Sequence, residues 1–161
     1  MSSRNEEARN LSVVKQYLKA FGSGNPDEMA NHLAENAVFE IPGPKNSAYS
    51  KHIVGKRSIH EFYAKRQETR GKFIKSTAVK PRFITGKNAV IAEWTVSGYT
   101  RDGEKFESRG TNHFTLNREG KIKKVSIFIN APLSSDVRSL AERRLMVSDQ
   151  GQLALMAWSV V

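Results

Sequence analysis

Three turn sequences divide the second half of the chain into apolar segments, and they constrain the fold more than any other feature. They are Gly86-Lys87-Asn88, Asp102-Gly103 and Arg118-Glu119-Gly120, and they follow Phe73, where the sequence becomes β-like. Asp-Gly between two apolar-rich segments is among the strongest short signals for a β-hairpin. Consecutive hairpins predict an antiparallel meander of four long strands.

The first half of the chain carries helical signals. Leu11, Val14, Leu18 and Phe21 recur at helical spacing, which predicts a helix over residues 6–21. Asn25-Pro26-Asp27-Glu28 then carries a capping residue, a proline suited to the first turn and an acid at the capping-box position. The remaining expected elements are a short helix ending near Asn36, a strand over 37–41, a polar loop over 45–54, and a helix carrying Ile59, Phe62 and Tyr63.

Helices that precede a run of strands predict an α+β fold. We expect a cone-shaped barrel in which three N-terminal helices pack on a curved antiparallel sheet. The chain has 161 residues, which suits one domain over residues 1–133 and a C-terminal helical extension over residues 134–161. Cysteine is absent, which excludes disulfides, thiolate metal sites and a cysteine nucleophile.

The formal net charge of +10 allows two interpretations. It could mark a polyanion partner, or it could be a solvated basic surface. We favour the solvated surface and expect no nucleic-acid partner, because the basic residues are scattered and no aromatic–basic interleaving occurs. The longest apolar run, residues 153–161, is far shorter than the ~20 residues of a membrane span. We therefore expect no membrane partner and a cytoplasmic location.

Several segments resemble a known superfamily. Val13 to Phe21 and Leu33 to Pro42 are similar to the opening of ketosteroid isomerases, and His60-Glu61-Phe62-Tyr63-Ala64 is similar to their third helix. Thr111 to Ile122 resembles their last two strands, and Arg109-Gly110 resembles a step in SnoaL-like polyketide cyclases. The chain is identified as a SnoaL-like, ketosteroid-isomerase-like member of the nuclear transport factor 2-like superfamily. This resemblance implies a cone pocket and a homodimer, and it leaves the reaction open.

The resemblance also assigns roles to individual residues. Tyr17 lies at the position of the tyrosine that donates to the developing enolate oxygen, Tyr63 at a supporting tyrosine, and Asn112 at the acid that completes the oxyanion hole. Ile41 lies where the isomerases keep their proton-shuttling aspartate, and isoleucine cannot move a proton. Asn130 lies nearest to the acid of the SnoaL-like cyclases. The isomerase mechanism in its known form is therefore excluded.

The strand pattern predicts an apolar interior around these polar groups. Its expected lining includes Phe39, Ile41, Tyr99, Ile127 and Ile129, with Tyr17, Tyr63 and Asn112 as the polar points. A mostly apolar lining with a few polar groups is typical of a small-molecule pocket. The alternative is a packed core in which Tyr17 and Asn112 bond to each other.

Two residues are candidate general bases. Alternation places Val90, Ala92, Trp94 and Val96 inward and Glu93 outward, whereas register counted through the Asp102-Gly103 hairpin places Glu93 and Tyr99 inward. An inward Glu93 would be desolvated and suited to accept a proton; an outward one would be solvated or face a dimer partner. His52 lies in the loop expected at the pocket mouth, where it could act as a base or simply be solvated.

We expect no metal site and no cofactor, because no histidine pair has ligand spacing. The leading function hypothesis is recognition of a small, largely apolar molecule with a carbonyl or hydroxyl group. In its enzyme version, Glu93 or His52 supports isomerase, cyclase or dehydratase chemistry without metal. In its binding version, the same pocket has no turnover. The third possibility is an interaction module that dimerises through the sheet.

Overall fold

The computed structural model describes residues 3–42, 51–70 and 72–131. Their order is α1 (Ser3–Gly22), α2 (Pro26–Ala30), β1 (Leu33–Ile41), β2 (Lys51–Val54), α3 (Lys56–Arg70), β3 (Ile74–Gly86), β4 (Ala89–Thr100), β5 (Lys105–Leu116) and β6 (Ile122–Ala131). The expected C-terminal helical extension lies outside the described residues. Among these residues, no helix is both long and apolar enough to cross a membrane.

Helix α2 begins where local chemistry predicts. The carbonyl oxygen of the Asn25 side chain accepts the backbone N–H of Glu28 at 3.1 Å, and the Asn25 amide donates to the Glu28 carboxylate at 3.3 Å. The first contact is the expected N-cap interaction, but Glu28 bonds the Asn25 side chain instead of its backbone N–H, which donates to the Ala20 carbonyl at 3.0 Å. The helix ends at Ala30 instead of near Asn36, however, because β1 already begins at Leu33.

The four long strands form the predicted meander. Strands β3, β4, β5 and β6 pair antiparallel with their neighbours in sequence. Gly103 and Gly120 lie in two of the connecting turns with φ of 85° and 79°, and Asn88 lies in the third with φ of 56°. Left-handed backbone at these positions suits glycine and asparagine, so the turn residues fix the hairpins.

The first two strands complete the sheet in a way that differs from the expectation. The strand order is β2-β1-β6-β5-β4-β3, and β1 pairs parallel with β6. The sheet is therefore mixed, not wholly antiparallel. Residues 51–54, which we expected in a loop, form β2 and pair with β1. A strand of four residues, two of them half-buried and two exposed, is too short to stand out from its sequence.

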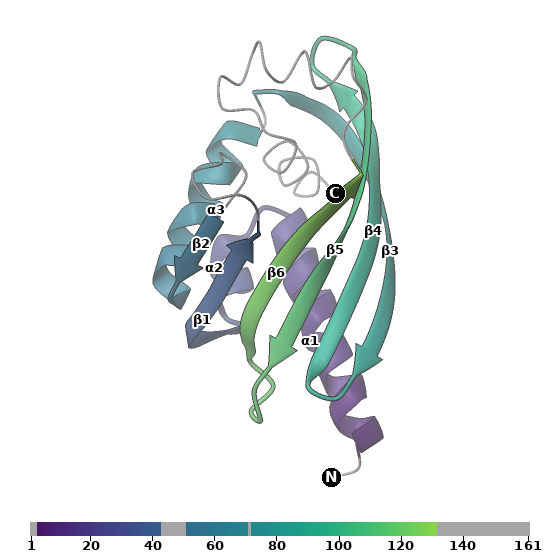
Figure 1. The fold of residues 1–161 in the computed structure, drawn as a ribbon. Helices are drawn as coiled ribbons and strands as arrows, with labels where there is room; N and C mark the ends of the chain where they lie inside the picture. Colours follow the sequence, from purple (N-terminus) through teal and green to yellow (C-terminus); the bar gives the residue numbers. More distant parts are fainter. Residues whose placement is uncertain (1–2, 43–50, 71, 132–161) are drawn as a thin grey trace.

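The three helices lie on one side of this curved, open sheet, and Figure 1 shows the resulting cone-shaped α+β architecture. Helix α1 contacts β3 and β4, α3 contacts β1 and β2, and α2 contacts both other helices. The side chains between the helices and the sheet form the core. The sheet side that faces the helices is called the inner face below, and the opposite side the outer face.

Candidate functional site

Two tyrosines from different helices meet in the core. Tyr17 of α1 and Tyr63 of α3 are 1% and 2% exposed, and their hydroxyl oxygens are 3.1 Å apart. Each tyrosine lies on the buried stripe of its helix, so the packing of α1 beside α3 brings the hydroxyls together. Burial raises the pKa of both phenols, although the hydrogen bond with Tyr63 lowers the pKa of Tyr17 in part. Both hydroxyls therefore stay protonated at neutral pH and can donate.

The aromatic surroundings of the two tyrosines differ. The ring of Tyr63 lies between Phe21, Phe39 and Phe62, with centroid distances of 4.8, 5.5 and 5.6 Å. The ring of Tyr17 contacts Phe114 of β5 at 5.6 Å in an edge-to-face arrangement. Tyr63 is therefore fixed among aromatic rings, and Tyr17 is the tyrosine beside the sheet.

Asn112 lies on the inner face, two residues from Phe114 on β5, and is 5% exposed. Its side-chain oxygen accepts a hydrogen bond of 2.9 Å from the indole nitrogen of Trp94 on β4. Among the described residues, no acceptor bonds the Asn112 amide hydrogens. Asn112 and Tyr17 thus have different partners. The packed-core alternative supposed a bond between these two residues, and the structure has none.

Trp94 was not among the residues that we assigned to the site, and it reaches Asn112 because of a glycine. Trp94 pairs with Gly110 across β4 and β5. A Cβ atom on Gly110 would lie 2.6 Å from the indole ring and 2.3 Å from the Phe128 carbonyl oxygen. Only glycine leaves room for the indole at this position. The Arg109-Gly110 step was the available sequence signal.

The expected apolar lining is buried on the inner face. Phe39, Ile41 and Ile127 are 0%, 4% and 2% exposed. Ile129 belongs to β6 and pairs with Gly110 in the register, and its side chain lies outside the described set. The register also places Phe39 beside Val125, and Ile127 beside Asn112. The apolar residues and the polar points therefore share one face, as alternation predicts.

The structure decides between the two predicted orientations of Glu93. Val90, Ala92, Trp94 and Val96 are buried, and Glu93 lies on the outer face in a groove of about 440 Å³. The groove also contains Lys80, Arg82, Thr95, Arg109 and Thr111. Tyr99 shares the outward direction and is 47% exposed. The inward direction that the hairpin register predicted is therefore wrong for both Glu93 and Tyr99. The outward direction that apolar alternation predicted for Glu93 is right, because burial of four apolar side chains stabilises the fold more than burial of one carboxylate would.

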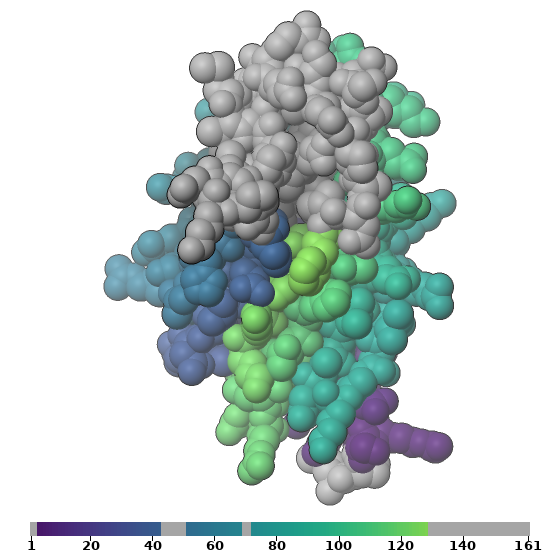
Figure 2. Space-filling model, viewed as in Figure 1, coloured from purple at the N-terminus to yellow at the C-terminus, as the bar shows by residue number. Residues whose placement is uncertain are grey.

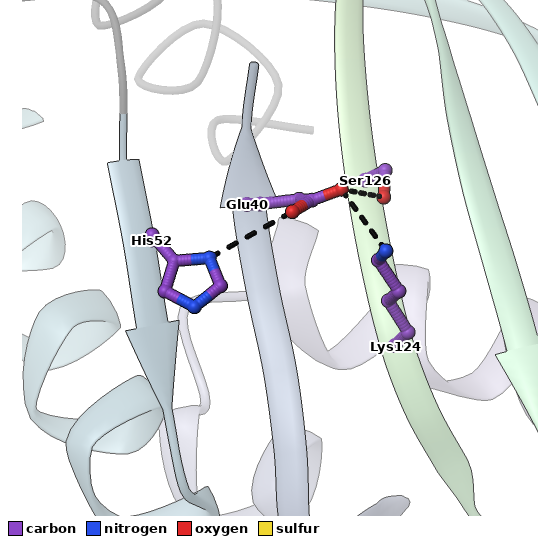
Figure 3. A network of polar contacts seen from close by, with 4 residues as sticks. All are labelled: Glu40, His52, Lys124 and Ser126. Atoms are coloured by element: carbon purple, nitrogen blue, oxygen red, sulfur yellow. Dashed lines mark hydrogen bonds and ion pairs between the residues drawn. The ribbon is translucent and has the colours of Figure 1, made fainter. Parts of the chain in front are cut away.

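His52 also lies on the outer face, within a polar cluster that sequence reasoning missed. Its Nδ1 atom is 3.7 Å from the Glu40 carboxylate, which accepts a 2.9 Å hydrogen bond from Ser126 and lies 3.2 Å from the Lys124 ammonium (Figure 3). Partial burial raises the pKa of Glu40, but hydrogen bonds from Ser126 and Lys124 and the charges of Lys124 and His52 outweigh it, so the net pKa lies below its ordinary value.

This arrangement limits the chemistry of the inner face. The buried polar side chains of the described residues are Asn10, Thr100, Ser108, Asn112 and Ser126, besides the two tyrosines. None of them is a carboxylate or an imidazole. Within the same residues, no cluster of three histidine, aspartate or glutamate side chains could hold a metal ion. The described inner face can donate and accept hydrogen bonds, and it contains no ready base.

Several solved structures share this fold. A putative isomerase from Bacillus subtilis superposes with a TM-score of 0.63 at 18% identity, over 93% of this chain and 99% of that one. SalBIII is an epoxide hydrolase/cyclase-like enzyme with a role in pyran ring formation in the polyether salinomycin. It superposes with a TM-score of 0.58 at 18% identity, over 77% of this chain and 92% of that one. A putative ketosteroid isomerase from Kribbella flavida superposes with a TM-score of 0.56 at 16% identity, over 78% of this chain and 81% of that one.

At these identities the structural neighbours establish the fold alone. No curated protein matches the chain. The sequence itself provides the closer assignment, because the family model of the SnoaL-like domain matches residues 14–125, which include Tyr17, Tyr63 and Asn112. That stretch runs from α1 to β6 and contains most of the cone. The chain belongs to the SnoaL-like domain family.

Proposed function

We propose that the domain binds a small, largely apolar molecule with a carbonyl or hydroxyl group, and that Tyr17 donates a hydrogen bond to that oxygen. The observation that carries this proposal is the tyrosine pair. Two hydroxyl groups hold two hydrogens, and their mutual bond uses only one of them. Among the described residues, no other acceptor bonds the second hydrogen. A buried donor without an acceptor costs about 1–3 kcal/mol, and a ligand oxygen would remove that cost.

The direction of donation follows from the surroundings of each ring. Tyr63 is enclosed by three phenylalanines, whereas Tyr17 contacts the sheet at Phe114, close to Asn112. In the proposed arrangement Tyr63 donates to Tyr17, and Tyr17 donates to the ligand. The Asn112 amide provides a second donor from the sheet. The apolar body of the ligand would contact the lining formed by Phe39, Ile41 and Ile127.

Binding is better supported than turnover. Polarisation of a carbonyl by Tyr17 would assist isomerase, cyclase or dehydratase chemistry. Such chemistry also needs a group that accepts a proton close to the substrate. The two bases expected from the sequence, Glu93 and His52, lie on the outer face. Among the described residues, the inner face therefore supports recognition without proton transfer.

Substitution of Tyr17 tests the proposed donor. We expect Tyr17→Phe to weaken binding of the ketone 2-acetonaphthone by about fivefold to tenfold, the equivalent of one hydrogen bond. Binding of 2-ethylnaphthalene, which has the same ring system and no oxygen, should change by less than about twofold. Calorimetric titration of the full chain measures both. The Tyr99→Phe variant, which removes an exposed hydroxyl, is the matched control. Equal ketone affinity in Tyr17→Phe and wild type would contradict the proposal.

A second candidate function is an interaction module, and one observation favours it. The outer face carries exposed apolar side chains, with Ile84 43% and Phe128 36% exposed. His113 lies against Phe128 with ring centroids 4.8 Å apart, and it pairs across the strands with Ile91. Figure 2 shows β4, β5 and β6 side by side on this face. We propose that two copies of the chain pair through it as a homodimer.

Disruption of this face tests the homodimer. We expect the wild-type chain to have the mass of a dimer in light scattering after size exclusion, and Phe128→Glu to have the mass of a monomer. The charge would be buried without a partner in the interface, which is costly. Ala8→Glu adds the same charge to an exposed position of α1 and should leave the dimer intact. A wild-type monomer, or a dimer that tolerates Phe128→Glu, would refute this pairing.

A further inference from the structure

A second groove lies between α1 and β3, on a different side of α1 from Tyr17. Its volume is about 450 Å³, within the usual range of small-molecule sites. It is lined by Lys15, Leu18, Lys19, Gly22 and Ser23 of α1 and by Val79, Pro81 and Phe83 of β3. None of the residues assigned to the proposed ligand site takes part. The groove is therefore a separate feature of the fold.

The sequence produces this groove through two periodicities that face each other. Residues 15, 18, 19 and 22 form one stripe of a helix, and residues 79, 81 and 83 form one face of a strand. In the described sheet, strand β3 lies at the edge and has β4 as its one strand neighbour. Its inner face is therefore only partly covered by α1, and Val79 and Phe83 remain half-buried against the core.

The base of the groove is apolar and its rim is cationic. Leu18, Val79, Pro81 and Phe83 provide the apolar surface. Lys15 and Lys19 are exposed one helical turn apart, and the Lys15 ammonium lies 5.4 Å from the centroid of the Phe83 ring. No acidic side chain of the described residues lines the groove. Among the described residues, no carboxylate forms an ion pair with either lysine.

We propose that this groove binds a medium- or long-chain carboxylate. The acyl chain would lie on Leu18, Val79 and Phe83, and the carboxylate would lie between the ammonium groups of Lys15 and Lys19. A neutral apolar ligand would leave the lysines unused, and an inorganic anion would leave the apolar base unused. Only an amphiphilic anion complements both, because its methylene groups would be buried on the apolar base and its head group would be attracted by two opposite charges.

The test measures how tightly the full-length protein binds two ligands whose alkyl chains have equal length. We expect decanoate, below its micellar concentration, to bind about fivefold to tenfold more tightly than 1-decanol in calorimetry, because of the two lysines. Lys15→Gln combined with Lys19→Gln should reduce the decanoate affinity to that of 1-decanol. The matched control, Lys105→Gln combined with Lys123→Gln, removes two exposed lysines from strands and should leave both affinities unchanged.

A variant that fills the groove tests whether the acyl chain of the ligand binds there. Val79→Phe should weaken both ligands by about tenfold or more, because its ring would occupy the space of the acyl chain. Binding of 2-acetonaphthone should persist, so failure of the inner-face site and failure of this groove are distinguishable. If Val79→Phe does not fold, decanoate-induced shifts of the Val79 and Phe83 amide resonances in the wild type serve instead.

Four results would overturn the inference. One is equal binding of decanoate and 1-decanol, and another is equal loss of affinity in the two double-lysine variants. The third is competition between decanoate and 2-acetonaphthone, which would place the acyl chain of decanoate on the inner face. Sedimentation with phosphatidylglycerol vesicles in the absence of decanoate binding would instead identify a membrane surface as the partner, and it would also refute the groove as a carboxylate site.

Discussion

Phe39→Ala is expected to lower the free energy of unfolding by about 3–5 kcal/mol, the usual cost of removing a buried phenylalanine ring. Phe39 is fully buried on β1. Its ring contacts Phe62 at 5.3 Å and Tyr63 at 5.5 Å, so it joins α3 to the sheet. Loss of the ring leaves a cavity beside the tyrosine pair. Chemical denaturation followed by circular dichroism measures the change.

The control for this prediction is Tyr99→Ala. Tyr99 is an aromatic residue of similar size on the outer face and is 47% exposed. Its removal should cost less than about 1 kcal/mol, since the ring buries little surface. A Phe39→Ala variant that is no less stable than Tyr99→Ala would show that β1 and α3 do not pack as described. It would also remove the structural support for the position of Tyr63.

Gly110→Ala is expected to lower the free energy of unfolding by about 2–4 kcal/mol, because the added methyl group has no space. Its Cβ atom would lie 2.3 Å from the Phe128 carbonyl oxygen and 2.6 Å from the Trp94 ring. The carbonyl belongs to the backbone of β6 and cannot move without disturbing the ladder between β5 and β6. The indole can move only by losing its hydrogen bond to Asn112.

Gly86→Ala provides the matched glycine control. Gly86 lies at the end of β3, and no atom lies within 4 Å of the position that its Cβ would occupy. We expect this variant to have the stability of the wild type or slightly more, because alanine restricts the unfolded chain. Denaturation curves of the two variants can be compared directly. Equal stability of Gly110→Ala and Gly86→Ala would contradict the close approach of Trp94 to β5.

Most of the architecture could be predicted from local signals. Turn residues with left-handed backbone define the hairpins around Asn88, Gly103 and Gly120. Helical spacing places Val14, Tyr17 and Phe21 on the buried side of α1. These signals are readable because the physical cause, backbone preference or burial of one face, acts on residues that are close in sequence.

The candidate site was predictable only in part. Resemblance to a known superfamily identified Tyr17, Tyr63 and Asn112, and the structure places all three among buried residues. The resemblance did not identify Trp94 as the partner of Asn112, and it did not identify the Glu40 cluster on the outer face. These contacts join different strands, and a side chain's partner across a sheet depends on the register.

Local signals were enough to predict the three helices, the meander of four long strands and the inward direction of the apolar residues on β4. The turn residues and apolar spacing act over a few positions, so each could be read where it stands. Three features became visible only in the folded chain: β1 pairs parallel with β6, residues 51–54 form a strand, and Tyr17 bonds to Tyr63. Those features join segments distant along the chain, and their geometry exists only after the helices have packed on the sheet.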